Sequence, residues 1–375
     1  MKIINYADLS YPEVRELPRP WPVLVPLGLD HYDLETAARA LSTEVIILLP
    51  AVPYGFQCDQ RTPRSRLQVP PGLLERTLAG ISKWLNIQGF QQVYFLNGHG
   101  EQKIKVTDYK LIDQPYLEPV ELTWPENLGE RVVLISTGHT EQHGYHLPLS
   151  TDSLIVEAIA ARLQELAPDE VFCLPVWPFG VSTHTREFPA TLNLGGRVFE
   201  DFFLVIVDRL IGLGADKIYF SNGHGGNHSF LVNVIKYAGE NHPKAFIATE
   251  WLHTTGPELN KYRESAIGGM GHGGELETSY ILHLRPDLVK MDRATREIEF
   301  AATQNYYMDW VEGGSLIANP PWSDDTTSGI YGDATLATAE KGRLWLEAAA
   351  QQKLSTIREI GLQQQLRQAK RALKS

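Results

Sequence analysis

The sequence predicts an α/β fold, with a mainly parallel sheet flanked by helices and a truncated copy of the same unit before it. Two observations lead to this prediction. Short β-branched segments alternate with helical segments between residues 131 and 250. A seven-residue stretch that begins at Tyr94 returns, with changes, at Tyr219, and both copies end in a glycine-rich turn. Such alternation is typical of parallel sheets, whose ligand sites lie beyond the carboxyl ends of the strands.

The strands expected in the second half are short and rich in Val, Ile and Phe. They cover residues 131–137, 170–176, 217–221 and 245–250. Apolar residues recur at helical spacing in residues 152–166, 197–213 and 227–237. A long final helix is expected over residues 335–370, and we assign it to packing rather than to chemistry.

The repeat also predicts how the chain is divided. The offset of 125 residues aligns Gly55 with Gly180 and Gly89 with Gly214, whereas residues 23–28 match residues 132–138 only at a smaller offset. The second copy therefore contains an insertion, which includes residues 140–148. We predict a partial, non-catalytic copy over residues 1–105, a linker over residues 106–130 and a catalytic domain over residues 131–375.

Composition and the first residues indicate the kind of partner and the compartment to expect. The chain has 34 basic and 45 acidic residues, a net charge of −11 that disfavours nucleic acid. No apolar run reaches the ~18 residues of a membrane span, and the first residues do not resemble a signal peptide, so we expect a cytoplasmic protein. Cys58 and Cys173 are too few to stabilise the chain by disulfides.

Four groups of polar residues follow predicted strands or turns of the second half. Glu141 and His143 lie two apart in an extended loop, so both side chains point the same way. The other groups are Asp152 at a helix start, His224 in a glycine-rich turn, and the segment 272–279. Taken singly, each has an ordinary alternative, such as a solvated carboxylate for Glu141, a helix cap for Asp152 and a hydrogen-bonding role for His224. Imidazole and carboxylate ligands without thiolates suit Zn, Mn or Fe.

Together these motifs resemble the creatininase family. The matching patterns are Glu-x-His-Gly-x-His-Leu-Pro-x-x-x-Asp at 141–152, His-x-x-x-Phe-Pro-x-Thr at 184–191, Asn-Gly-His-Gly-Gly-Asn at 222–227, His-x-Gly-Glu-x-Glu-Thr-Ser at 272–279, and a glycine-rich stretch at 328–342. The resemblance covers about residues 131–350. It implies a creatininase-like catalytic domain.

The resemblance also implies roles for individual residues. Glu141, Asp152 and His224 would hold one divalent metal ion, and His143 with the shared Asp152 the second. A hydroxide that bridges two cations is a strong nucleophile at neutral pH, and the cations polarise the carbonyl under attack. His272 is the candidate donor of a proton to the leaving nitrogen.

One position departs from the family pattern and leaves the second metal short of a ligand. Gly226 stands where creatinine amidohydrolase has a metal-binding glutamate. We expect Glu275 to supply the missing ligand and Glu277 to act in catalysis, although either glutamate could take the ligand position. Only one of them should face the site, because residues two apart on a helix point to opposite sides.

Other departures concern the substrate. Tyr145 replaces a usual proline and Ala190 a usual glycine, so creatinine itself is not supported as the substrate. The expected substrate contacts are His146, His184, Gly225 and Trp251. In the first copy an incomplete ligand set remains, which we interpret as vestigial: Asp30, His31, His99 and Glu101.

The expected function is hydrolysis of a carbon–nitrogen bond in a small amide, formamide or cyclic amide, with two divalent ions as cofactors. One alternative keeps the metals but acts on a cyclic polyol ketone or an ester-like bond, because fold and ligands do not fix the substrate. Another alternative is a non-catalytic assembly subunit. We expect a small-molecule substrate, a homo-oligomer, and neither nucleic acid nor membrane as a partner.

Overall fold

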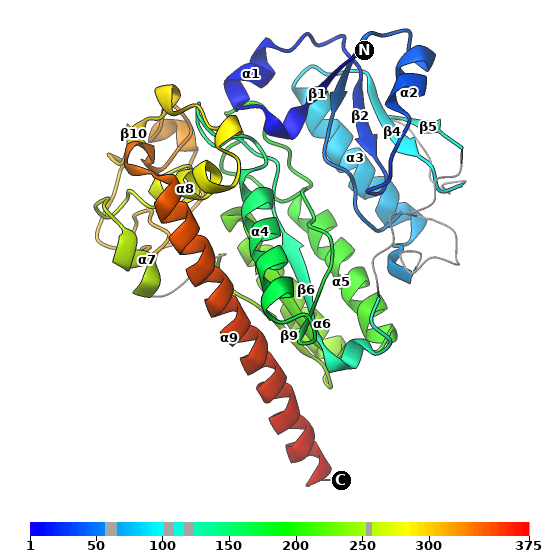
Figure 1. Cartoon of the computed structure of the whole chain (residues 1–375), viewed down its shortest axis with the longest axis vertical. Helices are drawn as coiled ribbons and strands as arrows, with labels where there is room; N and C mark the ends of the chain where they lie inside the picture. The colour runs from blue at the N-terminus through cyan, green and yellow to red at the C-terminus, as the bar shows by residue number, and fades with distance from the viewer. Residues whose placement is uncertain (57–65, 101–108, 116–123, 253–256, 375) are drawn as a thin grey trace.

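The computed structural model describes residues 1–56, 66–100, 109–115, 124–252 and 257–374. Within these ranges the chain forms two parallel sheets with helices against them (Figure 1). Cys58 and Glu101, which the sequence analysis considered, lie outside the described residues. Within the described ranges, none of the helices has the length and apolar character needed to cross a membrane.

The first sheet lies in the N-terminal part of the chain. Its strands are all parallel and run in the order β1-β3-β2-β4-β5, where β1 is Lys2–Asn5, β2 Val23–Pro26, β3 Val45–Leu48, β4 Val93–Asn97 and β5 Lys110–Asp113. Three helices accompany this sheet: α1 (Tyr11–Glu16), α2 (Leu34–Ala40) and α3 (Pro71–Ile87). Strand β5 falls in the segment that we predicted to be a linker, so this sheet extends beyond the predicted boundary at residue 105.

The second sheet forms where the sequence predicts it. It has the order β7-β6-β8-β9, all parallel, with β6 at Val132–Thr137, β7 at Val171–Cys173, β8 at Lys217–Asn222 and β9 at Phe246–Thr249. The helices around it are α4 (Thr151–Leu166), α5 (Gly196–Gly212) and α6 (His228–Asn241). The predicted α/β fold with a parallel sheet is therefore confirmed.

The two sheets share one order of strands. By position in the sequence, β3-β2-β4-β5 corresponds to β7-β6-β8-β9. Corresponding backbone bonds also recur, since Gly28 donates its N–H to the Val52 carbonyl (2.9 Å) and Gly138 donates to the Trp177 carbonyl (3.0 Å). These correspondences support the internal repeat, which we retain as a proposal.

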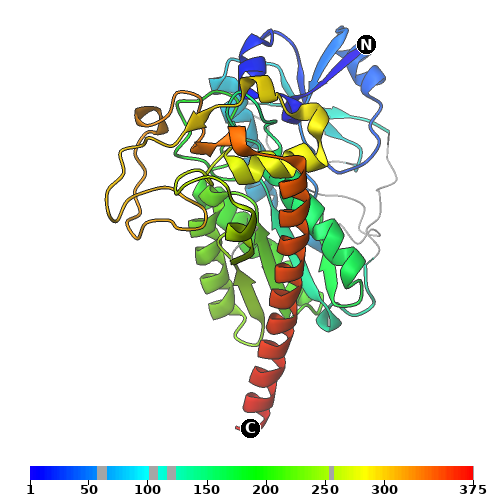
Figure 2. The ribbon, with the colours of Figure 1, turned by 60° about the vertical axis from the view of Figure 1, so that its left-hand side comes forward.

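The C-terminal part adds helices and irregular segments beside the second sheet. It contains α7 (Pro257–Tyr262), α8 (Glu275–Leu284), a short antiparallel pair of β10 (Arg296–Glu297) with β11 (Gly332–Asp333), and α9 (Ala339–Ala372). Helix α9 packs along α8 and α4. Its last turns extend beyond the body of the molecule in both views (Figures 1 and 2).

The two sheets are joined by one hydrophobic core. A single cluster of buried side chains contains residues from both, including Val23 and Phe95 from the first and Val133 and Phe220 from the second. Tyr54 packs against Trp177, with ring centroids 5.4 Å apart. Burial on this scale makes the N-terminal unit an integral part of the fold.

The N-terminal unit also holds the loop that carries the predicted ligands. Leu149 donates its N–H to the Leu9 carbonyl (2.9 Å), and Ser150 donates to the Ala7 carbonyl (3.0 Å).

Ala190 has a φ of 76°, in the left-handed region that favours glycine, at a cost of roughly 1–2 kcal/mol. The Gln88 side chain, from the N-terminal unit, stabilises this conformation because its Oε1 accepts the Ala190 N–H at 2.9 Å.

Candidate metal centre

The Glu141–His146 loop begins just beyond the carboxyl end of β6. Glu141 and His143 are fully buried there, and their side chains reach one site, as their spacing predicts. Gly144 turns the loop with a φ of 71°, and a Cβ at this position would lie 2.4 Å from Ile330 Cγ2. The turn therefore requires glycine.

Asp152 bridges the two histidines of the cluster. It occupies the first turn of α4, with Oδ1 3.1 Å from His143 Nε2 and Oδ2 3.3 Å from His224 Nδ1. The two carboxylate oxygens thus face two different imidazoles. This is the geometry expected of a carboxylate shared by two cations.

Both imidazoles are held in the tautomer that metal binding requires. His224 donates its Nε2–H to the Val181 carbonyl (2.9 Å), so the Nδ1 lone pair faces Glu141 Oε1 at 2.9 Å. His143 donates its Nδ1–H to the Glu141 carbonyl (3.2 Å), so its Nε2 faces Asp152 Oδ1 at 3.1 Å. A backbone acceptor on the distant nitrogen fixes ring orientation in the same way in known metal sites.

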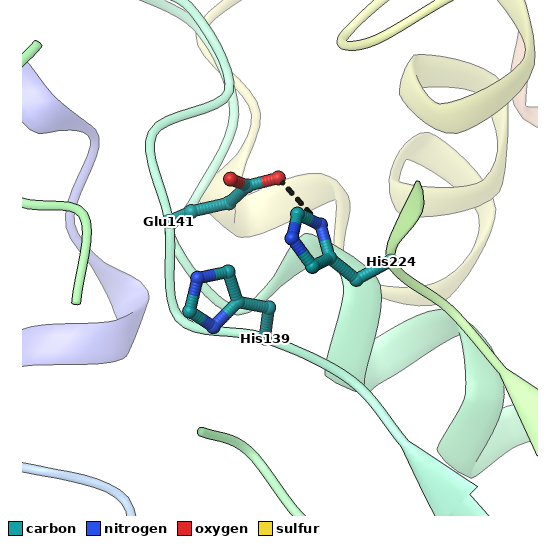
Figure 3. Close-up of side chains that lie close together, drawn as sticks. All are labelled: His139, Glu141 and His224. Atoms are coloured by element: carbon teal, nitrogen blue, oxygen red, sulfur yellow. Dashed lines mark ion pairs between the residues drawn. The ribbon is translucent and has the colours of Figure 1, made fainter. Parts of the chain in front are cut away.

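Buried carboxylate oxygens that only imidazoles face show that the cluster fits a cation. Both carboxylate oxygens of Glu141 and the Oδ2 of Asp152 are buried and have no hydrogen-bond donor among the described residues apart from the imidazole nitrogens nearby, His224 Nδ1 and His272 Nδ1. Figure 3 shows Glu141 and His224 converging, together with His139. Since burying unsatisfied carboxylate oxygens is costly, divalent metal ions are the group that this cluster is built to hold.

The electrostatics of the cluster point the same way. Burial opposes ionisation of Glu141 and Asp152, but His224 and His143 outweigh it and hold the pKa of both carboxyls below its ordinary value. Burial disfavours the charged form of the two imidazoles, but the neighbouring carboxylates outweigh it. They raise the pKa of His143 to about 9 and that of His224 well above its usual range. The carboxylates require positive charge, and a bound cation would supply it in exchange for protons.

The two glutamates of α8 point in opposite directions, as the helix period predicts. Glu277 is fully buried with Oε2 3.7 Å from His143 Nε2, and burial raises its pKa to about 7. Glu275 instead pairs with Lys341 Nζ at 2.7 Å and accepts N–H bonds from Glu264 and Ser265. Our assignment of Glu275 as a ligand is therefore corrected, because Lys341 and two backbone donors already occupy its carboxylate.

The neighbourhood of Gly226 leaves no room for a side chain, and therefore none for a carboxylate ligand, at this position. A Cβ at this position would lie 2.2 Å from the Val181 carbonyl and 2.4 Å from His224 Nε2. A side chain there would disrupt the bond that orients His224. Within the described residues, Glu277 is the α8 carboxylate that forms a potential ligand group with His143 and Asp152, so it fits the ligand position better than the catalytic role expected from the sequence.

Changing each glutamate to glutamine separates their roles. We expect Glu277→Gln to lose one metal ion per chain, because a neutral amide is a much weaker ligand than a carboxylate. Glu275→Gln is the matched control, since it removes an equally buried carboxylate two residues away and should keep the metal content. Elemental analysis after desalting measures both, and equal metal loss in the two variants would contradict the assignment.

His272 lies against the same cluster. Its Nε2–H donates to the Gln142 carbonyl (2.7 Å), so the unprotonated Nδ1 faces Glu141 Oε1 at 3.6 Å. Burial lowers its pKa to about 3, so the ring is neutral at physiological pH. The position of Nδ1, which faces the cluster, suits proton transfer there, whereas burial alone disfavours the protonated ring.

A cavity of about 150 Å³ opens beside these residues. Three of the predicted substrate contacts, His184, Gly225 and Trp251, lie in its wall. His146 does not, and this prediction is corrected: the turn at Gly144 directs the ring away, where Nε2 meets the Thr278 hydroxyl at 2.9 Å. Burial lowers the pKa of His146 to about 3, so it serves as a neutral core residue.

Several residues at the site were missed from the sequence. Trp310 and Trp322 line the cavity from an irregular segment after α8, and Trp322 lies 4.4 Å from the His184 ring. His139, two residues before Glu141, forms a potential ligand group with Glu141 and His224. A histidine so close to a predicted ligand was the available signal for His139, whereas no periodic pattern marks the two tryptophans.

Comparisons of the sequence and of the structure with known proteins indicate the same family. A family model described as creatinine amidohydrolase (creatininase) matches residues 23–110 and 120–357. The creatinine amidohydrolase of Pseudomonas putida is 30% identical over 259 residues, which are 64% of this chain and 95% of that protein. The mycofactocin precursor peptide peptidase of Mycolicibacterium smegmatis is 33% identical over 219 residues, 56% of this chain and 78% of that protein.

A solved structure of manganese creatininase has the same fold. It superimposes with a TM-score of 0.52 at 27% sequence identity, and the match covers 62% of this chain and 91% of that protein. Its manganese agrees with the oxygen and nitrogen donors found here.

Proposed function

Because this chain belongs to the creatininase family of hydrolases, we propose that it hydrolyses a carbon–nitrogen bond in a small, uncharged amide with the aid of two divalent metal ions. The observation that carries the proposal is the set of buried carboxylate oxygens on Glu141 and Asp152 that have no hydrogen-bond donor among the described residues apart from the imidazole nitrogens nearby. A non-catalytic assembly subunit would have no need for such a costly arrangement.

Five side chains would hold the metals. Glu141 and His224 serve the first, His143 and Glu277 the second, and Asp152 is shared between them. When bound, such ions activate water and polarise the carbonyl of the substrate. His272 would move the proton from the attacking water to the leaving nitrogen, because its Nδ1 faces the cluster.

The cavity wall favours a small and planar substrate. Trp251, Trp310 and Trp322 supply flat apolar surface, and a volume of about 150 Å³ admits only a small group. None of the described residues that line the cavity is a lysine or arginine. A substrate with its own carboxylate would lack a side-chain cation to pair with, which favours an uncharged amide, formamide or cyclic amide.

A substrate panel tests the proposal. We expect the metal-loaded protein to hydrolyse uncharged cyclic amides and formamides with planar groups faster than a peptide or a cyclic keto-polyol. Trp251→Ala should raise KM about tenfold with a smaller effect on kcat, because loss of a stacking surface costs ~1.4 kcal/mol.

Tyr237→Ala, which removes an aromatic side chain that is 58% exposed, is the control and should leave KM unchanged. Preference for the keto-polyol would support the alternative reaction, and preference for the peptide would overturn the small-amide assignment.

A further inference from the structure

His139 is a buried histidine beside the metal cluster for which the proposed chemistry gives no role. It follows β6, and its side chain is fully buried. The Gly180 N–H donates to His139 Nδ1 at 2.8 Å. Because Nδ1 accepts this bond, the ring proton of the neutral imidazole must sit on Nε2.

The surrounding backbone holds the ring in this state. A Cβ at Gly180 would lie 2.5 Å from Asn227 Oδ1 and 3.0 Å from the His139 ring, so only glycine lets the donor approach. Asn227 completes the frame by accepting the Val181 N–H (3.0 Å) and donating to the Gly138 carbonyl (3.2 Å). The tautomer is therefore fixed by two strand-end loops.

The protonated nitrogen lies on the side of the cluster. His139 Nε2 is buried and finds no acceptor among the described residues. The ring centroid is 4.5 Å from that of His224, and one nitrogen of the ring lies on the Glu141 side while the other points away (Figure 3). The Nε2–H that lacks an acceptor thus lies near the Glu141 carboxylate, with which His139 forms a potential ligand group.

The same geometry separates His139 from the ligands. In His143 and His224 a carbonyl accepts the proton of the distant nitrogen, which leaves a lone pair facing the cluster. In His139 the distant nitrogen is Nδ1, and it accepts a hydrogen bond from the Gly180 N–H. The proton of the neutral ring is therefore on Nε2, which faces the cluster. A protonated imidazole nitrogen cannot bind a metal.

We propose that His139 is a positioning residue, whose Nε2–H donates to the Glu141 carboxylate oxygen that the metal leaves free. This bond would fix the rotamer of a ligand whose two oxygens, once His224 Nδ1 gives up its proton to bind the metal, have no other donor in the described part of the chain. Outer hydrogen bonds of this kind are worth ~10- to 100-fold in metal affinity.

Two substitutions give opposite results under the two interpretations of His139. His139→Gln places an amide N–H where Nε2–H lies but gives up the bond from Gly180. His139→Asn keeps an acceptor for Gly180 but removes the donor toward Glu141. We expect His139→Asn to weaken one Zn²⁺ site ~10- to 100-fold, whereas His139→Gln stays within a few fold of the native affinity.

The measurement is titration of the metal-free full-length protein with Zn²⁺ in competition with a chromophoric chelator, together with the melting temperature of each variant. A residue that served only to accept the Gly180 N–H would give the reverse order, with glutamine worse than asparagine. That order, or native affinity in both variants, overturns the proposal. These outcomes do not depend on substrate turnover, so they stand apart from the test of the reaction.

Long-range ¹H–¹⁵N spectra of the native zinc-loaded protein give an answer that needs no variant. We expect a protonated Nε2 on His139 and protonated distant nitrogens on His143 and His224. A metal-bound Nε2 on His139 would overturn the proposal and make His139 a ligand.

Discussion

Replacing Asp152 with alanine is expected to release both metal ions and to lower turnover by more than ~10³-fold, since metal catalysis supplies several kcal/mol of the barrier reduction. The reason is geometric. One carboxylate oxygen faces His143 and the other faces His224, so a single substitution removes a ligand from both positions. The remaining ligands at each position would be too few to offset dehydration of the ion. Elemental analysis and hydrolysis of the best amide in the panel measure the two effects.

Glu165→Gln provides the matched control. Glu165 lies on the same helix as Asp152, but its side chain is 68% exposed and pairs with Arg162, so metal content and turnover should not change. Circular dichroism should show native helix content in both variants. Retention of two metal ions by Asp152→Ala would show that the cations bind elsewhere.

The parallel sheet could be predicted because its strands are buried on both faces. Such strands are uninterrupted runs of Val, Ile and Phe, and the helices between them carry their own period. The predicted strand over residues 217–221 and helix over residues 152–166 differ from β8 and α4 by one residue. The unpredicted β5 is an edge strand, Lys110–Asp113, that is only partly buried, so its apolar signal is weak.

The direction of a ligand depends on contacts that are distant in sequence. The helix period indicates that Glu275 and Glu277 face opposite sides but not which of them faces the metals. Lys341, which lies in the first turn of α9 much later in the chain, decides the question by pairing with Glu275. His146 shares the motif with His143, yet the turn at Gly144 sends it to Thr278.

The role of His139 depends on the fold in the same way. Only the approach of the Gly180 N–H, from a loop 41 residues later, determines which ring nitrogen carries the proton. Trp310 and Trp322 reach the cavity from a segment with little regular structure. Neither feature leaves a periodic signal in the sequence.

Replacing His272 with alanine is expected to keep the metals and the fold while lowering turnover by ~10²- to 10⁴-fold, the usual worth of a positioned proton donor. The five side chains proposed to hold the metals do not include His272, so its removal should leave the ligand set complete. Its Nε2–H is held by the Gln142 carbonyl, so Nδ1 can receive a proton and deliver it. The loss should be smallest for amides whose leaving group needs no proton.

His283→Ala is the control, because His283 lies in the last turn of the same helix as Glu277, away from the cavity wall. It should keep full activity and metal content. The rival interpretation of His272 is that it binds a metal, since its Nδ1 belongs to a potential ligand group with Glu141 and His143. Metal loss in His272→Ala would establish that rival, and full activity would exclude His272 from the chemistry. Retained metal with turnover lost in proportion to the basicity of the leaving group would identify His272 as the proton donor, because only a group that protonates the leaving nitrogen produces that dependence.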